Sequence, residues 1–290
     1  MGNQSSRTGE PGRQPNDHEM MILYRLQKSL YTRLIQSPQH LSLLESLWNL
    51  THQHKSGIKF EPISEYWKWD AGFSSCNPGD DLRSMGELGL RCLIYFVQNH
   101  YTEFTLMRRR RGGYPFAKSA MAVARSICQV FYLVDLDGHP GRFPIQLTLY
   151  WQLLHDEMVF YKLFGLFFFK FEELYCDWVA QHRSKEINNT CSIGTIILLV
   201  ENGKQLLLGE LNKAPTEVSD LARMCGNGVV VVSKRAKPME RIDGAQALTS
   251  SVWKIQSKKA DMHSARAKEA LALNLFAGLL EKSVHGTLAA

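Results

Sequence analysis

The sequence lacks the cysteine patterns of a disulfide scaffold or a zinc site. Its 290 residues include six cysteines, and no two of them have C-x-x-C spacing. No group of histidines and cysteines has zinc-finger spacing either. The polar stretch that extends to about Glu19 does not fit a secretory signal. We therefore expect free thiols in a reducing, cytoplasmic compartment, and no bound metal.

A hydrophobic run long enough to cross a bilayer is also missing. The most apolar stretch, residues 158–169, is interrupted by Lys162 and followed by Lys170. A membrane-spanning helix needs about 20 apolar residues. The stretch instead predicts a helix that is buried in a protein core.

The motifs of several enzyme classes are absent. No Walker A motif, G-x-S-x-G or H-E-x-x-H occurs, so a nucleotidase, an esterase or a zinc protease has no support. No motif indicates that the chain itself binds GTP or a cofactor. The formal charge of +6 permits an anionic partner such as a lipid headgroup or a nucleotide phosphate. We expect no nucleic acid partner.

What is present begins at the N-terminus, where Gly2 and Ser6 fit the N-myristoylation pattern M-G-x-x-x-[ST]. The alternative is a disordered tail that begins with glycine by chance. One myristoyl chain binds membranes only marginally, so a second signal is expected. The basic run Arg108, Arg109, Arg110 and Arg111 is a candidate, either for anionic lipid or for an acidic protein surface, although it also fits a solvated helix end. The pattern predicts a lipoprotein that associates peripherally with a membrane.

Hydrophobic spacing predicts a mainly helical chain after a disordered tail at residues 1–18. Gly, Ser, Asn and Pro in close succession predict a loop over residues 72–81. The last helix is either one long element or two that are broken near Gly165. The expected helices cover residues 19–54 (divided at Pro38), 66–71, 82–100, 102–111, 116–133 and 145–182.

The pattern changes near residue 186. Asn202 and Gly203 lie between the apolar runs 195–200 and 205–211, a combination that favours a β-hairpin. Further strands are expected at 228–232 and 252–256, and a helix at 260–284. We therefore expect a helical domain over residues 19–185 and a small α+β module over 190–290.

One segment carries a family signature. Residues 72–90 read GFSSCNPGDDLRSMGELGL, and Tyr95-Phe96 follows them. This resembles the signature of the ELMO domain, roughly W-x3-GFQ-x3-P-x-TDFRG-x-G followed by a leucine-rich helix that ends in Y-F. Residues 114–117 resemble its Y-P-F-A element, and residues 160–178 its final aromatic helix, so the resemblance covers about 40–183. The departures are Ser74 for Gln, Asp80 for Thr, Leu82 for Phe, Ser84 for Gly, and Trp67 and Trp69, each one residue out of place.

The resemblance implies a helical ELMO-type fold and a role with small GTPases. Small ELMO-domain proteins act as GTPase-activating proteins for the Arf and Arl families, and large ones scaffold exchange factors for Rac. This chain resembles the small kind, an activator of another enzyme rather than a stand-alone enzyme. By the same resemblance, Arg83 is the catalytic candidate, and the partner-binding candidates are Gly72, Phe73, Pro78, Asp81 and Gly86.

An arginine suits this chemistry because GTP hydrolysis spreads negative charge over the phosphoryl oxygens. A guanidinium supplied by a partner offsets that charge and never titrates. Arg83 follows Pro78 and Gly79, and small residues after it leave room for a second protein. Two alternatives stay open for the residue: an ion pair with Asp81 or Glu87 that only stabilises the loop, or adaptor binding without catalysis. A membrane-associated structural protein is a third reading of the chain.

Overall fold

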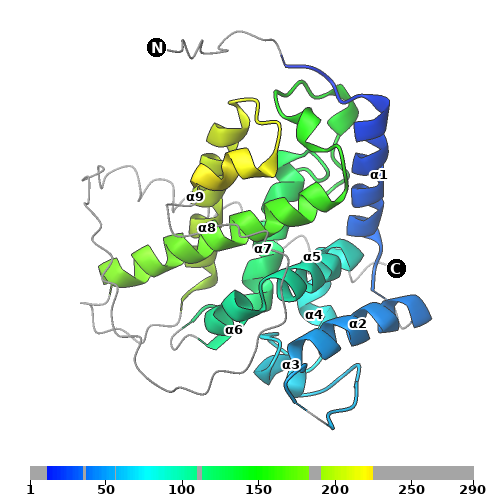
Figure 1. Ribbon diagram of the computed structural model, residues 1–290, viewed down its shortest axis with the longest axis vertical. Helices are drawn as coiled ribbons and strands as arrows, with labels where there is room; N and C mark the ends of the chain where they lie inside the picture. Colours follow the sequence, from blue (N-terminus) through cyan, green and yellow to red (C-terminus); the bar gives the residue numbers. More distant parts are fainter. Residues whose placement is uncertain (1–11, 35–36, 56, 110–112, 183–190, 225–290) are drawn as a thin grey trace, which may run out of the picture. The chain divides into compact units, whose positions relative to one another are not determined.

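The computed structural model describes residues 12–34, 37–55, 57–109, 113–182 and 191–224. The chain divides into two compact units, 1–229 and 230–290, and all the described residues belong to the first. Figure 1 shows their helices. The α-helices are α1 (Asp17–Tyr31), α2 (Pro38–Thr51), α3 (Tyr66–Trp69), α4 (Gly79–Leu82), α5 (Gly86–Asn99), α6 (Tyr101–Arg109), α7 (Phe116–Val130), α8 (Met158–His182) and α9 (Ile193–Leu211). The 3-10 helices are η1 (Phe143–Ile145), η2 (Trp151–Leu153) and η3 (Val218–Met224).

The prediction of a mainly helical chain is confirmed for the described residues. In place of strands, this part of the chain holds two isolated antiparallel bridges, Arg13 with Thr148 and Val134 with Pro140. Among the described helices, none combines the length and the apolar character that a bilayer crossing requires.

Helix α1 begins at Asp17 because Asn16 and Glu19 cap its first turn. The Asn16 side chain accepts a hydrogen bond from the Glu19 N–H (2.9 Å), and the Glu19 carboxylate accepts one from the Asn16 N–H (2.8 Å). Such a capping box satisfies two N–H groups that the helix leaves unpaired. One side of the helix is buried against α5 through Ile22, Leu23, Leu26 and Leu30.

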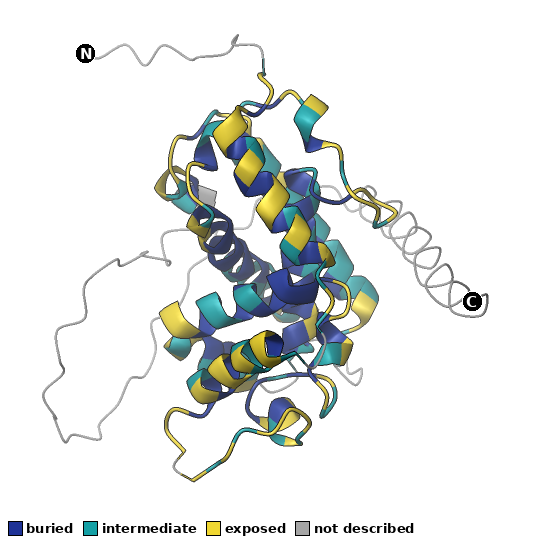
Figure 2. Ribbon diagram, turned by 90° about the vertical axis from the view of Figure 1, so that its right-hand side faces the viewer, coloured by how far each residue is buried: buried dark blue, intermediate teal, exposed yellow. Residues whose placement is uncertain are grey.

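Helices α5, α7 and α8 pack against one another and form the aromatic core. The ring of Phe96 on α5 lies 6.1 Å from Phe164 and 5.0 Å from Phe168, both on α8. Figure 2 shows these central helices as predominantly buried ribbon. The prediction that residues 158–169 belong to a core helix is confirmed, since α8 is buried along most of its N-terminal half.

The predicted start of that helix at residue 145 was wrong. Residues 143–145 and 151–153 form the turns η1 and η2, and α8 begins only at Met158. Phe143 and Trp151 lie in these short turns, and their side chains are buried. Apolar residues in this stretch therefore contribute to the core without forming a longer helix. Gly165 lies inside one continuous helix and does not break it.

The predicted hairpin at Asn202-Gly203 was also wrong, because residues 193–211 form the single helix α9. Ser192 caps its start by accepting a hydrogen bond from the Thr195 N–H (3.1 Å). Gly203 has a packing role, since a Cβ at this position would overlap the ring of Phe167 on α8. The buried residues of α9 recur at helical spacing: Ile196, Leu199, Val200, Gly203, Leu207 and Leu211.

Helix α9 packs against α7 and α8, so it extends the helical assembly instead of opening an α+β module. The described residues do not support that module. The predicted strands at 228–232 and 252–256 and the predicted helix at 260–284 lie outside the described residues. The same holds for Gly2 and the rest of the tail to residue 11.

Candidate functional site

Arg83 lies in the segment that joins α3 to α5, and this segment is fixed to the core at its start. The ring of Phe73 is buried and packs edge-on against Trp67, with centroids 5.6 Å apart. Gly72 has φ +77°, and a Cβ there would lie 2.9 Å from the Cβ of Phe116. The Gly72 carbonyl accepts a hydrogen bond from the Ala117 N–H (3.1 Å) in the first turn of α7. Glycine is required here because the backbone is left-handed and abuts a side chain.

Asp81 closes the segment into a compact loop. Its carboxylate accepts a hydrogen bond from the Ser74 N–H (2.7 Å) and a second from the Ser74 hydroxyl. The Asp81 residue is only 7% exposed. A carboxylate that accepts two hydrogen bonds fixes the residues around it, because an unsatisfied buried charge is costly. Asp81 therefore orients the backbone that carries Arg83.

The far end of the loop is held by Gly86, the first residue of α5. Its φ is +51°, and a Cβ there would lie 2.5 Å from the carbonyl oxygens of Leu30 and Thr32. The next residue, Glu87, donates its N–H to the Thr32 carbonyl (3.0 Å). Gly86 thus lets α5 start directly against the C-terminal end of α1.

Arg83 itself points into solvent. Its side chain is 84% exposed, and its ion pair is with the exposed Asp80, at 3.5 Å between Nη2 and Oδ1. An exposed pair of this kind contributes little to stability. The acids named in the alternative interpretation are engaged elsewhere, Asp81 with Ser74 and Glu87 with Arg91 (2.7 Å). The guanidinium is therefore presented on a rigid turn without being locked to the core.

The other residues of the motif lie on the inner side of the loop. Phe73, Pro78, Asp81 and Gly86 are all buried, and Gly72 is half-buried. The surface beside Arg83 is contributed by the exposed residues Asp80 and Ser84. The residues predicted to bind a partner thus lie beneath the surface of the loop and hold the backbone that carries Arg83.

The geometry of the loop also explains two departures from the ELMO signature, Ser74 in place of glutamine and Leu82 in place of phenylalanine. Leu82 is fully buried, so a leucine in place of phenylalanine changes the core beneath the loop and not its surface. Ser74 supplies both donors to Asp81. This pairing had no signal in the sequence, because it joins residues seven positions apart across an irregular turn.

The predicted basic run is only partly visible. Arg108 is half-buried, donates a hydrogen bond to the Trp69 carbonyl and lies 5.7 Å from the centroid of the Phe104 ring. Burial lowers the pKa of its guanidinium. Arg109 is exposed at the end of α6, while Arg110 and Arg111 lie outside the described residues. Arg108 thus joins α6 to α3 and is not a free surface cation.

Beside this contact lies an exposed aromatic side chain. Trp69 is 60% exposed at the end of α3, just before the loop. Its backbone is fixed by Arg108, and its ring packs edge-on against Tyr66 (5.8 Å). A large aromatic residue held in the open is a typical anchor for a protein partner.

One group of possible metal ligands occurs among the described residues. Asp135, Asp137 and His139 lie in the exposed turn before η1, with ligand atoms within 4.8 Å of one another. The Asp135 carboxylate already accepts the His139 N–H (2.8 Å). This hydrogen bond closes the turn.

Taken together, these features define a helical domain that presents one arginine on a buttressed loop. Comparison with known proteins identifies the class, because the ELMO/CED-12 family matches residues 25–190. This match spans more than half of the chain, so the protein belongs to the ELMO/CED-12 family.

Several proteins named for an ELMO domain are similar to this chain. The chain is 31% identical over 154 residues to ELMO domain-containing protein A of Dictyostelium discoideum, covering 49% of this chain and 15% of that protein. It is 28% identical over 167 residues to ELMO domain-containing protein C of the same organism, covering 56% and 26%. Human ELMO domain-containing protein 2 is 33% identical over 109 residues, covering 34% and 36%. The matches thus span well under half of these relatives. No solved structure matches the chain.

Proposed function

We propose that this protein is a GTPase-activating protein for a small GTPase of the Arf/Arl family, and that it supplies Arg83 in trans. ELMO-family proteins are known in small-GTPase signalling, which supports a GTPase as the partner. The observation that carries the proposal is the exposure of Arg83 on a loop that is anchored by the buried residues Asp81 and Gly86.

Stimulation of GTP hydrolysis in trans requires a cation that reaches the nucleotide bound to another protein. An arginine supplied by a partner raises GTP hydrolysis by about a thousand- to a hundred-thousand-fold. The gain depends on positioning, since the guanidinium must meet the transferring phosphoryl group without a large ordering cost. The Asp81–Ser74 bonds and the Gly86 contact fix the backbone of the loop, and the weak pair with Asp80 leaves the side chain available.

The assay is phosphate release from a panel of Arf and Arl GTPases, with and without the full chain. Stimulation by the parent that is abolished by both Arg83→Ala and Arg83→Lys supports the mechanism, because lysine lacks the planar fork. Arg142→Ala is the matched control, since Arg142 is also an exposed arginine but lies elsewhere. Undiminished stimulation by the Arg83→Lys variant would contradict the mechanism.

The second candidate is an adaptor that uses the same face to bind a GTPase or its exchange factor without stimulating hydrolysis. The exposed Trp69 favours a binding surface of this kind. Binding that is lost in Trp69→Ala, with no stimulation by the parent of any GTPase in the panel, would select the adaptor. If the parent neither binds nor stimulates any GTPase in the panel, the third interpretation remains, a structural protein.

The membrane part of the proposal rests on Gly2. We propose that Gly2 is myristoylated and that the acyl chain tethers the protein reversibly to a membrane where its GTPase resides. A single chain gives marginal binding, so the tether is reversible by itself. Mass spectrometry of the protein from its own cells decides this, and an unmodified Gly2 would end the proposal.

A further inference from the structure

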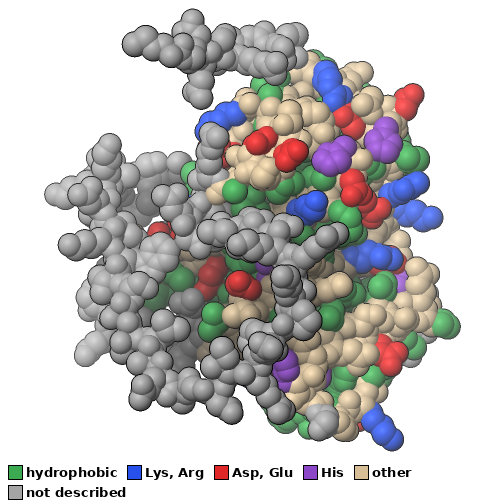
Figure 3. All heavy atoms as spheres, in the orientation of Figure 1, with side chains coloured by type: hydrophobic (Ala, Val, Ile, Leu, Met, Phe, Trp, Pro, Cys, Tyr) green, Lys and Arg blue, Asp and Glu red, His purple; other side chains and the backbone are tan. Residues whose placement is uncertain are grey.

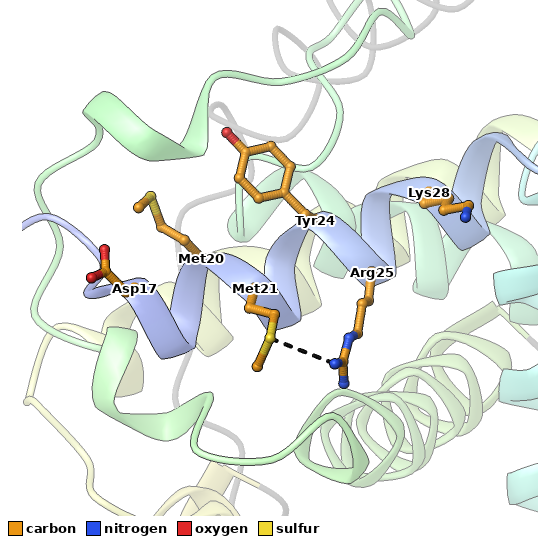
Figure 4. A pocket seen from close by; sticks show the side chains of 6 residues that line it. All are labelled: Asp17, Met20, Met21, Tyr24, Arg25 and Lys28. Atoms are coloured by element: carbon orange, nitrogen blue, oxygen red, sulfur yellow. Dashed lines mark hydrogen bonds between the residues drawn. The ribbon is translucent and has the colours of Figure 1, made fainter.

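Helix α1 carries exposed apolar residues on its outer side in addition to the buried ones on its inner side. A surface helix normally turns a polar face to solvent. On α1 the outward stripe instead carries Met20, Met21 and Tyr24 between Asp17, Arg25 and Lys28, and these six residues line a shallow groove. Figure 4 shows Met20 and Tyr24 on one flank of the helix and Met21 and Arg25 on the other, with an Arg25 nitrogen 3.5 Å from the Met21 sulfur.

Residues 136–158 lie beside this helix and share its exposed apolar character. Tyr31 donates to the Gly138 carbonyl (3.0 Å), the ring of Tyr24 lies 4.9 Å from that of Phe143, and a His18 ring nitrogen lies 3.0 Å from the His155 carbonyl oxygen. The segment therefore follows α1 from one end to the other. In Figure 2 this side of the protein faces the viewer, with exposed ribbon on α1 and on the loops beside it.

Exposed apolar residues are concentrated here. Of the twelve large hydrophobic residues that are exposed among the described ones, seven belong to α1 or to residues 136–158. Exposed apolar groups that gather in one region mark an interaction site, whereas scattered ones need no explanation. We name these seven the α1 face: Met21, Tyr24, Tyr31, Leu136, Ile145, Leu147 and Met158.

The described part of the chain begins at the edge of this face. Arg13 exchanges two backbone hydrogen bonds with Thr148 (3.0 Å each), next to Leu147, so the chain is fixed there. Gly12 lies ten positions after Gly2, and an extended segment of ten residue steps reaches at most about 33–36 Å. An acyl chain on Gly2 would therefore enter a bilayer within reach of the α1 face.

The charges around the face are of both signs. Arg25, Lys28 and Arg142 are exposed cations, and Asp17 and Asp137 are exposed acids. Figure 3 shows basic, acidic and histidine side chains interspersed along the edge where α1 runs. Anionic lipid would attract the cations of the groove, while the acids limit that attraction, so apolar contact is the main contribution.

We propose that the α1 face lies against an anionic lipid bilayer and provides the second membrane contact that a single acyl chain requires. The inference rests on the proposed acylation of Gly2. It also orients the candidate site, since Gly86 packs against the C-terminal end of α1. Helix α1 is about 22 Å long, so the start of α1 lies roughly that distance from Gly86, at the end of the loop that carries Arg83.

The test is sedimentation of the full chain, myristoylated during expression and verified by mass spectrometry, with vesicles of phosphatidylcholine alone or mixed with phosphatidylserine. Met21→Asp combined with Tyr24→Asp should lower the bound fraction about tenfold, because two apolar contacts are replaced by charges. Arg25→Glu combined with Lys28→Glu should lower binding only to the vesicles that contain phosphatidylserine. Leu106→Asp is the matched control, since Leu106 is 65% exposed on α6, and its binding should equal that of the parent.

A second measurement avoids charged substitutions. Tyr24→Trp should add tryptophan fluorescence that lipids with brominated acyl chains quench, whereas Leu106→Trp should not. Parent-like sedimentation of the Met21/Tyr24 variant, or equal quenching at positions 24 and 106, would overturn the proposal. So would a concentration-dependent dimer of the parent that Tyr24→Asp dissociates in the absence of vesicle binding.

Failure of this inference is separable from failure of the proposed function. GTPase stimulation measured without vesicles tests Arg83 and should be unchanged by Tyr24→Asp. Arg83→Ala should in turn leave vesicle binding intact.

Discussion

The carboxylate of Asp81 accepts both hydrogen bonds that Ser74 can donate, one from the backbone N–H and one from the hydroxyl. The pair joins the start of the loop to the turn that carries Arg83, two residues beyond Asp81. Arg83 can stay exposed because the rigidity of its surroundings comes from this neighbouring acid and not from a contact of its own.

Asp81→Asn should destabilise the protein by about 1–3 kcal/mol, because an amide cannot accept both donors and places an NH2 group among them. The free energy of unfolding in urea measures this. Asp80→Asn is the matched control, since Asp80 is exposed, and its effect should stay within about 0.5 kcal/mol. Equal losses for the two variants would show that Asp81 does not hold the loop.

Gly86→Ala should cost well over about 1 kcal/mol. A Cβ at this position meets two carbonyl oxygens of the α1 terminus, and the left-handed backbone adds strain. Gly57→Ala separates the two causes, because Gly57 also has a positive φ (+86°), but a methyl group there would meet no atom within 4 Å. We expect the smaller loss for Gly57→Ala in urea unfolding; the reverse order would mean that α5 does not start against α1.

Gly203→Ala tests the helix that replaced the predicted hairpin. Its methyl group would overlap the Phe167 ring, so the variant should be destabilised by about 1–3 kcal/mol. Gly209→Ala on the same helix meets no atom within 4 Å and should be neutral or stabilising, by up to about 1 kcal/mol. In a hairpin the two substitutions would have no reason to differ in this direction, and thermal unfolding of both variants distinguishes the cases.

Stability should fall as the pH drops through the ordinary histidine range, in part because of His100. Burial lowers the pKa of this half-buried imidazole, whose ring packs edge-on against Phe169 (4.9 Å). The unfolded chain therefore binds a proton at His100 more readily than the folded protein does, so acidification favours unfolding below about pH 6.5.

His100→Gln removes this titration. The loss of unfolding free energy between pH 7.5 and 5.5 (about two units apart, spanning the ordinary histidine pKa) should be smaller in the variant than in the parent. An identical pH dependence would show that His100 has the same proton affinity in both states.

Much of the helical framework was predictable because its signals are local. The spacing of Leu23, Leu26 and Leu30 marks the buried side of α1, although the helix begins at Asp17, two residues before its predicted start. Arg83 was expected near the start of a helix over residues 82–100, whereas the structure places it on the turn between α4 and α5, which begins only at Gly86. Its catalytic role stays a prediction.

The parts that could not be predicted depend on residues distant in sequence. Asn202-Gly203 favours a turn when read alone, yet Gly203 is there because the Phe167 ring crosses it. Gly86 likewise fits a family pattern, but its reason lies in the carbonyl groups of Leu30 and Thr32, more than fifty residues earlier. Such close approaches are set by how whole helices pack, which a local pattern does not encode.

The weak hold on the Arg83 side chain has a consequence for how the surface of the loop can vary. Since the loop is braced by other residues, a substitution at this one position would change the charge that the loop presents while the helical scaffold persists. Under the proposed function, a single codon change would therefore turn an activator into a binder without an unfolded intermediate.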